Sequence, residues 1–141
     1  MQRFANLDEF LAACGDARKW RRVAEAVQRA DRILPEVTCS IGDSLTYRVT
    51  TRPDCTELTG HRRYLEARCV LDGAAVIEVA PEADLQPTDT YSDLADRRHF
   101  AGSGERYRLD AGELAVVEVG EAVRDVAIDG RVMVLRITVE G

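Results

Sequence analysis

Residues 61–73 (HRRYLEARCVLDG) alternate between two kinds of side chain, which strongly constrains what this segment can form. On a β-strand, successive side chains point to opposite faces of the sheet. One face would carry polar groups that can pair with one another, namely Arg62, Tyr64, Glu66 and Arg68. The other face would carry Leu65, Ala67 and Cys69. The polar row is either a solvated outer face or the lining of a polar cavity, and the alternation alone leaves both interpretations open.

The rest of the chain divides into a helical lead-in and a series of short strands. Helical spacing of apolar residues predicts two helices within 6–34, with Asn6 or Asp8 as the first cap, a break at Gly15 and an end at Pro35. Trp20 falls on the apolar stripe of the second helix, at 17–33, and is predicted to be core. Period-two segments predict strands at 45–49, 62–71, 74–79, 107–109, 114–119, 123–128 and 132–139. Asp72-Gly73 and Asp129-Gly130 are predicted turns, and 81–104 is predicted to be rich in loops. This pattern favours a mainly β, antiparallel barrel or sandwich with N-terminal α-helices.

Length and charge place limits on function. The 141 residues predict one domain, with 1–35 as the lead-in and 37–141 as the barrel. The net charge of −6, with acids and bases well mixed, argues against a nucleic-acid partner. The sequence has no apolar run near the ~20 residues of a membrane span and no signal-peptide pattern, so we expect no membrane partner and a cytoplasmic location. Four widely spaced cysteines (Cys14, Cys39, Cys55 and Cys69) fit neither a zinc knuckle nor a redox motif, so we expect free thiols.

Several segments, taken in order, resemble one protein family. The stretch His61-Arg62-Arg63-Tyr64-Leu65-Glu66 is similar to that family's His-Arg/Lys-x-Tyr-Ile-Asp core. The opening at 4–7, the threonine-basic stretch at 50–53, the acidic segment at 91–96, the turn at 109–116 and the valine-rich strand at 131–137 also match in order and spacing. The chain thus resembles a divergent member of the YhcH/YjgK/YiaL family, which includes the small β subunit of evolved β-galactosidase.

The resemblance implies a cupin-like barrel of the double-stranded β-helix type, with a polar central cavity. It also implies carbohydrate metabolism, with anomerisation of sialic acid as the best-defined activity. Under this resemblance Arg62, Tyr64, Glu66 and Arg68 would line the cavity and bind a small-molecule carbohydrate.

Departures from the family's pattern bear on metal binding. Thr59 stands where members have a glutamate, and Val123 stands where they have a second histidine. His61 alone would not hold a zinc-like divalent metal tightly, so we expect no cofactor; His61 would be a ligand if a metal were bound. Arg68 stands where glutamine is common, and its guanidinium would repel a cation and attract the carboxylate of an acid sugar.

Some residues are candidates for the chemistry. His61 and Glu66 would be the acid–base pair of an anomerase or mutarotase, with Tyr64 as a hydrogen-bond donor. Alternatively, His61 is a surface histidine and Glu66 a structural salt bridge to Arg62 or Arg68. Arg136 either reaches into the cavity or lies on an outer face. Glu118, in an otherwise apolar segment, would need a partner such as Arg136 or Arg68 if buried, and is a further candidate for substrate binding.

Three functions follow from these candidates. The first is a sugar-processing isomerase that uses His61 and Glu66. The second is a non-catalytic sugar-binding or regulatory protein that has lost the metal site. The third is a partner subunit of a glycosidase. A homodimer through an apolar outer face is also expected.

Overall fold

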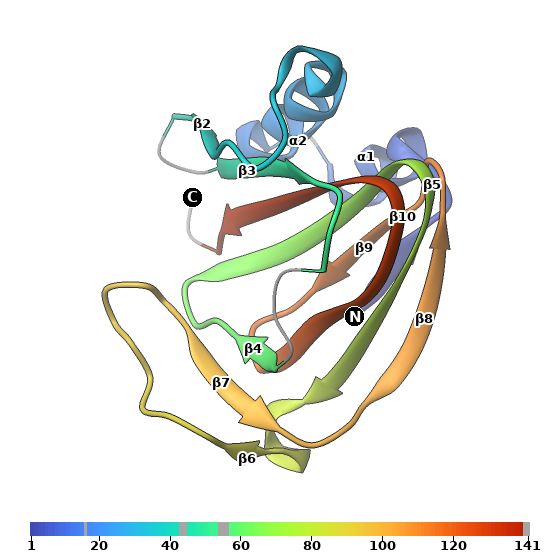
Figure 1. The fold of residues 1–141 in the computed structure, drawn as a ribbon. Helices are drawn as coiled ribbons and strands as arrows, with labels where there is room; N and C mark the ends of the chain where they lie inside the picture. The colour runs from blue at the N-terminus through green and yellow to red at the C-terminus, as the bar shows by residue number, and fades with distance from the viewer. Residues whose placement is uncertain (16, 43–44, 54–56, 140–141) are drawn as a thin grey trace.

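The computed structural model describes residues 1–15, 17–42, 45–53 and 57–139, and Figure 1 shows how they are arranged. Two helices, α1 (Leu7–Cys14) and α2 (Arg18–Gln28), lead into the sheet, and a 3-10 turn follows at Ala30–Arg32. The Asn6 side chain accepts a hydrogen bond from the Glu9 N–H (2.8 Å), which confirms Asn6 as the first cap. None of the helices in these ranges is long and apolar enough to cross a membrane.

In the described ranges, ten strands form the sheet, and all are paired antiparallel. They are β1 (Gln2–Phe4), β2 (Cys39–Ile41), β3 (Leu45–Thr50), β4 (Leu58–Gly60), β5 (Tyr64–Pro81), β6 (Gln86–Pro87), β7 (Arg98–Ala101), β8 (Glu105–Asp110), β9 (Leu114–Val117) and β10 (Glu121–Thr138). The mainly β, antiparallel class with N-terminal helices is confirmed. The sheet curls around its own inner face, as in a cupin-like fold (Figure 1). Five short strands of two to four residues were not predicted: β1, β2 and β4, and also β6 and β7, which lie in the segment 81–104 that was predicted to be rich in loops.

The two predicted Asp-Gly turns are wrong, because β5 and β10 each continue through their dipeptide as one long strand. Gly73 and Gly130 face each other across this strand pair, and both have positive φ (74° and 103°). A Cβ on Gly73 would lie 1.8 Å from the Asp129 carbonyl oxygen, so only glycine allows the strands to approach this closely. The Asp72 carboxylate accepts hydrogen bonds from the Arg131 N–H (2.8 Å) and Arg131 Nε (2.7 Å). The dipeptides therefore bend two paired strands together, and this bend curls the sheet.

Alternation along β5 and β10 separates two apolar clusters. Ala67, Cys69, Met133, Leu135 and Ile137 pack beneath the helices with Phe10 and Val23. Trp20 is half-buried at the edge of this cluster, and its ring meets that of Phe10 edge to face (5.7 Å between centroids). Val70, Val132, Val134 and Ile77 form the second cluster, on the opposite face. Cys14, Cys39 and Cys69 are free thiols, as predicted, whereas Cys55 lies outside the described residues.

Candidate functional site

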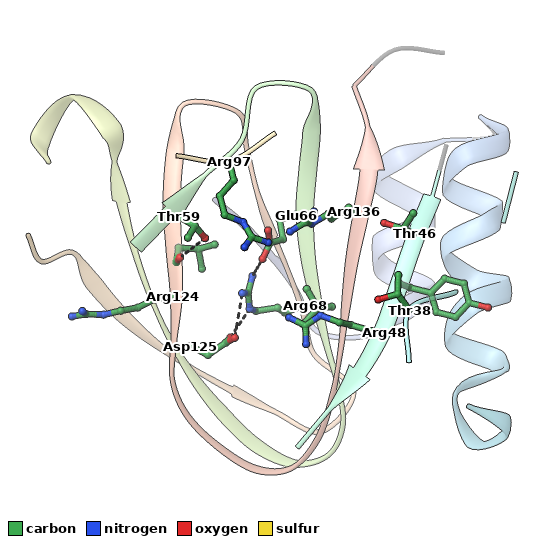
Figure 2. Close-up of a pocket in the computed structure, with 13 residues that line it drawn as sticks. Thr38, Thr46, Arg48, Thr59, Glu66, Arg68, Arg97, Arg124, Asp125 and Arg136 are labelled. Carbon is green, nitrogen blue, oxygen red and sulfur yellow. Dashed lines mark hydrogen bonds and ion pairs between the residues drawn. The ribbon is translucent and has the colours of Figure 1, made fainter. Parts of the chain in front are cut away.

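A polar pocket with a volume of about 330 Å³ opens on the inner face of the curled sheet. Its walls come from β3, β4, β5 and β10, together with Arg97 just before β7 (Figure 2). Five arginines line it (Arg48, Arg68, Arg97, Arg124 and Arg136) and two carboxylates (Glu66 and Asp125). The remaining lining residues are Thr38, Thr46, Tyr47, Thr59, Val123 and Val134. Arg124 and Arg48 also form ion pairs with carboxylates outside the pocket wall, Glu78 (2.8 Å) and Glu36 (3.6 Å). The positive charge that would attract an anion therefore comes chiefly from Arg97 and Arg136.

Strand register explains why these charges meet. Glu66 on β5 lies directly opposite Arg136 on β10, and Arg136 lies opposite Thr46 on β3. In the next inward-facing row, Arg68 lies opposite Val134. Residues directly opposite each other on antiparallel strands have neighbouring side chains. Three strands that are far apart in the sequence therefore contribute side chains to one polar surface.

Arg68 is the centre of a buried ion network. Its Nη1 lies 2.8 Å from Glu66 Oε1, and its Nε donates to Asp125 Oδ1 (2.6 Å). All three side chains are at most 7% exposed. Burial penalises the charged form of Arg68, but the two carboxylates outweigh this penalty and raise the pKa of the guanidinium. For Glu66, burial pushes the pKa up, whereas Arg68, the hydrogen bond to His61 and Arg136 together hold the pKa below its ordinary range.

His61 lies behind Glu66 and is not part of the pocket wall. Its ring is buried between two oxygen acceptors: Nδ1 donates to the Asp96 carbonyl oxygen (2.5 Å), and Nε2 is hydrogen-bonded to Glu66 Oε2. A carbonyl oxygen only accepts, so Nδ1 carries a hydrogen. The hydrogen bond between Nε2 and Glu66 Oε2 requires one further proton between these two atoms. His61 therefore acts on the pocket only through Glu66.

Asp96 organises the turn that holds His61. Its carboxylate accepts hydrogen bonds from the backbone N–H groups of Arg62 (2.9 Å) and Arg63 (3.1 Å to Oδ2), and from the Tyr91 hydroxyl. Burial raises the pKa of Asp96, but these hydrogen bonds outweigh burial and keep that pKa below its usual value. Asp96 has φ +49°, a left-handed conformation that Asp and Asn tolerate better than most residues.

We expect Asp96→Ala to lower the free energy of unfolding by about 2–3 kcal/mol, because it leaves two partly buried N–H groups and the Tyr91 hydroxyl without an acceptor. Asp96→Asn is the matched control, since it keeps one acceptor oxygen and tolerates the left-handed backbone; it should cost about half as much. Urea unfolding followed by circular dichroism measures both variants. Wild-type stability in Asp96→Ala would contradict this role for the carboxylate.

Arg97 and Arg136 complete the pocket opposite Arg68. Figure 2 shows both guanidiniums directed toward the cavity beside Glu66. Nε of Arg97 is buried, and no residue in the described part of the chain provides it with a hydrogen-bond acceptor. A buried donor without a partner is costly, so Arg97 is a candidate for binding an acceptor group of a ligand.

The other predicted site residues are placed as follows. Arg136 lines the cavity, which settles the alternative left open by the sequence. Tyr64 is half-buried and lines a neighbouring cavity instead. Arg62 precedes β5, is exposed and lies over the Tyr91 ring (4.0 Å from the centroid), so it is not part of the polar pocket. Glu118 is exposed beyond the end of β9 and is not a pocket residue, since the strand ends at Val117.

Sequence reasoning missed Asp96, Arg97 and Asp125. Asp125 lies two residues after the inward-facing Val123 on β10, so period-two alternation could have found it. Arg97 and Asp96 lie in the connection before β7, where no periodicity indicates which way a side chain points.

The pocket does not suit a divalent metal. Within the described ranges, no three His, Cys, Asp or Glu side chains gather as ligands. Both nitrogens of His61 are engaged. His99 is not part of the pocket wall, and its Nδ1 is hydrogen-bonded to Asp89 (2.6 Å). Thr59 and Val123 occupy the wall where the family pattern would supply ligands, and Arg68 would repel a cation there.

Comparisons with known proteins give similarity at the level of fold. No protein-family model matches the sequence, so the resemblance to the YhcH/YjgK/YiaL family stays a prediction. The chain is similar to a hydroquinone 1,2-dioxygenase from Sphingomonas sp. TTNP3 (16% identity, 79% of this chain and 70% of that chain, TM-score 0.49). It is also similar to a second hydroquinone 1,2-dioxygenase, solved with Cd²⁺ and 4-hydroxybenzonitrile (19%, 98% and 87%, TM-score 0.47). A third match is the CENP-C cupin domain of Drosophila melanogaster (10%, 86% and 99%, TM-score 0.47). These matches carry no conclusion about activity.

Proposed function

We propose that this chain binds a small acid sugar in the arginine-lined pocket, with the sugar carboxylate between Arg97 and Arg136. The observation that carries the proposal is the position of Arg97 and Arg136 in the pocket wall, with the buried Nε of Arg97 lacking an acceptor among the described residues. Guanidinium binds carboxylate in a bidentate way, and the threonines of the wall suit sugar hydroxyls. A volume of about 330 Å³ is at the small end of ligand sites, which fits a monosaccharide.

A second candidate function, anomerisation, is favoured by the His61–Glu66 pair beside the pocket. The Glu66 carboxylate would accept the proton of the anomeric hydroxyl as the bond between the anomeric carbon and the ring oxygen breaks. It would then return that proton to the ring oxygen of the open-chain sugar, and ring closure reverses these steps. With its pKa held low, Glu66 is a weak base in the empty pocket. A bound carboxylate would offset the charge of Arg136 and thereby raise the basicity of Glu66.

Calorimetric titration with glucuronic acid, and with glucose as the neutral match, tests the binding function. We expect saturable binding of glucuronic acid and at least about tenfold weaker binding of glucose, since charge-assisted hydrogen bonds contribute ~1.5–3 kcal/mol. Sialic acid should bind as well. If no acid sugar binds, or if glucose binds equally well, the proposal is wrong.

Exchange between the anomers of sialic acid and of glucuronic acid, measured by NMR, separates an enzyme from a binding protein. Catalysis predicts faster exchange with the wild type and none above the uncatalysed rate with Glu66→Gln or His61→Ala. Affinity in these variants should stay within about tenfold, ~1.4 kcal/mol. If the protein bound an acid sugar without speeding the exchange between its anomers, it would be a binding protein and not an anomerase. The homodimer and the glycosidase complex stay predictions.

A further inference from the structure

A second cavity borders the polar pocket. It has a volume of about 300 Å³, and Tyr64, Arg63 and residues 94–96 form its other walls. Three residues, Thr46, Arg97 and Arg136, line both cavities. The two arginines are therefore the shared wall of an inner chamber, which is the polar pocket, and an outer chamber.

The outer chamber differs from the inner one in chemistry. The Asp96 carboxylate is already engaged with the Arg62 and Arg63 backbone and with Tyr91. Arg63 Nη2 donates to the Asp93 carbonyl oxygen (2.5 Å). What remains for a ligand is the half-buried Tyr64 ring, Ala95 and Leu94, whose side chain is 99% exposed. An aromatic ring and an exposed leucine offer apolar surface and one hydroxyl, which suits the C–H face of a sugar ring and not a second charge.

We propose that the two chambers hold one ligand: a disaccharide, or longer saccharide, whose acidic unit lies in the inner chamber and whose neutral unit lies in the outer one. This inference rests on the proposed function, because it takes the acid-sugar carboxylate to lie at Arg97 and Arg136. Each chamber has about the volume of the smallest ligand sites, so each accommodates one sugar ring. The shared arginines then select a carboxylate near the glycosidic link.

Calorimetric titration with two probes tests this. The probes are glucuronic acid and a disaccharide that carries a neutral hexose on O4 of glucuronic acid and keeps the anomeric hydroxyl free. We expect the disaccharide to bind about tenfold more tightly or better, the gain from removing ~60 Å² of apolar surface from water. Cellobiose, which has the same size and no carboxylate, should bind more weakly than either.

Leu94→Ser and Tyr64→Phe test the chamber itself, through the ratio of the two dissociation constants. Leu94→Ser should reduce the disaccharide advantage severalfold, whereas Tyr64→Phe should largely keep it. Leu34→Ser is the matched control, because Leu34 is 74% exposed and lines neither chamber. In this variant the ratio of the dissociation constants for glucuronic acid and the disaccharide should equal that of the wild type.

The outcomes separate this inference from the proposed function. Binding of glucuronic acid with no advantage for the disaccharide would overturn the two-chamber ligand and leave the acid-sugar pocket in place. An advantage that Leu94→Ser leaves intact would overturn the assignment of the outer chamber. Failure of both acidic probes to bind would overturn the proposed function and this inference with it.

Discussion

Arg68→Met should lower the free energy of unfolding by about 3–5 kcal/mol, the cost of breaking a buried ion pair from one side. The methionine would fill much of the volume of the arginine stem, but Glu66 and Asp125 would lose the cation they share. Both carboxylates are almost fully buried, so water in the pocket would replace the guanidinium only in part. A loss of this size is a large part of the stability of a small protein, and denaturant unfolding measures it directly.

Arg108→Met is the matched control for this substitution. Arg108 forms an ion pair with Asp110 on β8, and both side chains are more than 60% exposed. An exposed pair contributes at most about 1 kcal/mol, so this variant should differ little from the wild type. Equal effects of the two substitutions would contradict a buried network around Arg68.

The pH dependence gives a second check with a definite sign. The folded-state pKa of Glu66 lies below its ordinary value of 4.5, so its contribution to stability is complete above that value. The contribution is lost as the pH falls through the lower, folded-state pKa. In Arg68→Met, Glu66 loses the guanidinium that lowers its pKa and can take up a proton more easily, so the stability difference from the wild type should shrink between pH 7 and about 4.

The alternation of residues 64–69 predicted the arrangement of β5 well, because strand periodicity is a local property. Glu66 and Arg68 face the cavity, whereas Ala67 and Cys69 face the helices. The Asp-Gly dipeptides were misread for a physical reason. The same glycine conformation permits either a hairpin or a bend in two paired strands, and the choice depends on a partner strand more than 50 residues away.

The site was harder to predict than the fold, because it depends on register and on an irregular connection. The sequence left open whether Arg136 faces the cavity or the outer side of the sheet. Its position opposite Glu66 on the paired strands places it on the cavity side. His61 was expected to touch the substrate, but the turn held by Asp96 places it behind Glu66. No local pattern marks Arg97, which lines the pocket because the connection before β7 runs along it.

Replacing both Arg97 and Arg136 by glutamine should weaken glucuronic acid binding by about 100-fold or more. Each guanidinium lost removes a charge-assisted hydrogen bond worth ~1.5–3 kcal/mol, and each 1.4 kcal/mol is a factor of ten. Glutamine keeps a hydrogen-bonding side chain but removes the charge and the planar fork. The affinity for glucose, which has no carboxylate, should change far less. Titration calorimetry of both sugars against wild type and variant measures the difference.

Lysine at the same two positions separates charge from geometry. Lysine keeps the positive charge but cannot bind a carboxylate in a bidentate way, so its affinity for glucuronic acid should fall between those of the wild type and the glutamine variant. Arg108→Gln, on the exposed face of β8, is the control for a general loss of positive charge and should bind like the wild type. If the double glutamine variant bound glucuronic acid as tightly as the wild type, Arg97 and Arg136 would not be the carboxylate site. If the glutamine and lysine variants bound glucuronic acid equally weakly, the planar, bidentate geometry of the guanidinium would determine affinity and its charge would not. The site would then be specific for planar anions.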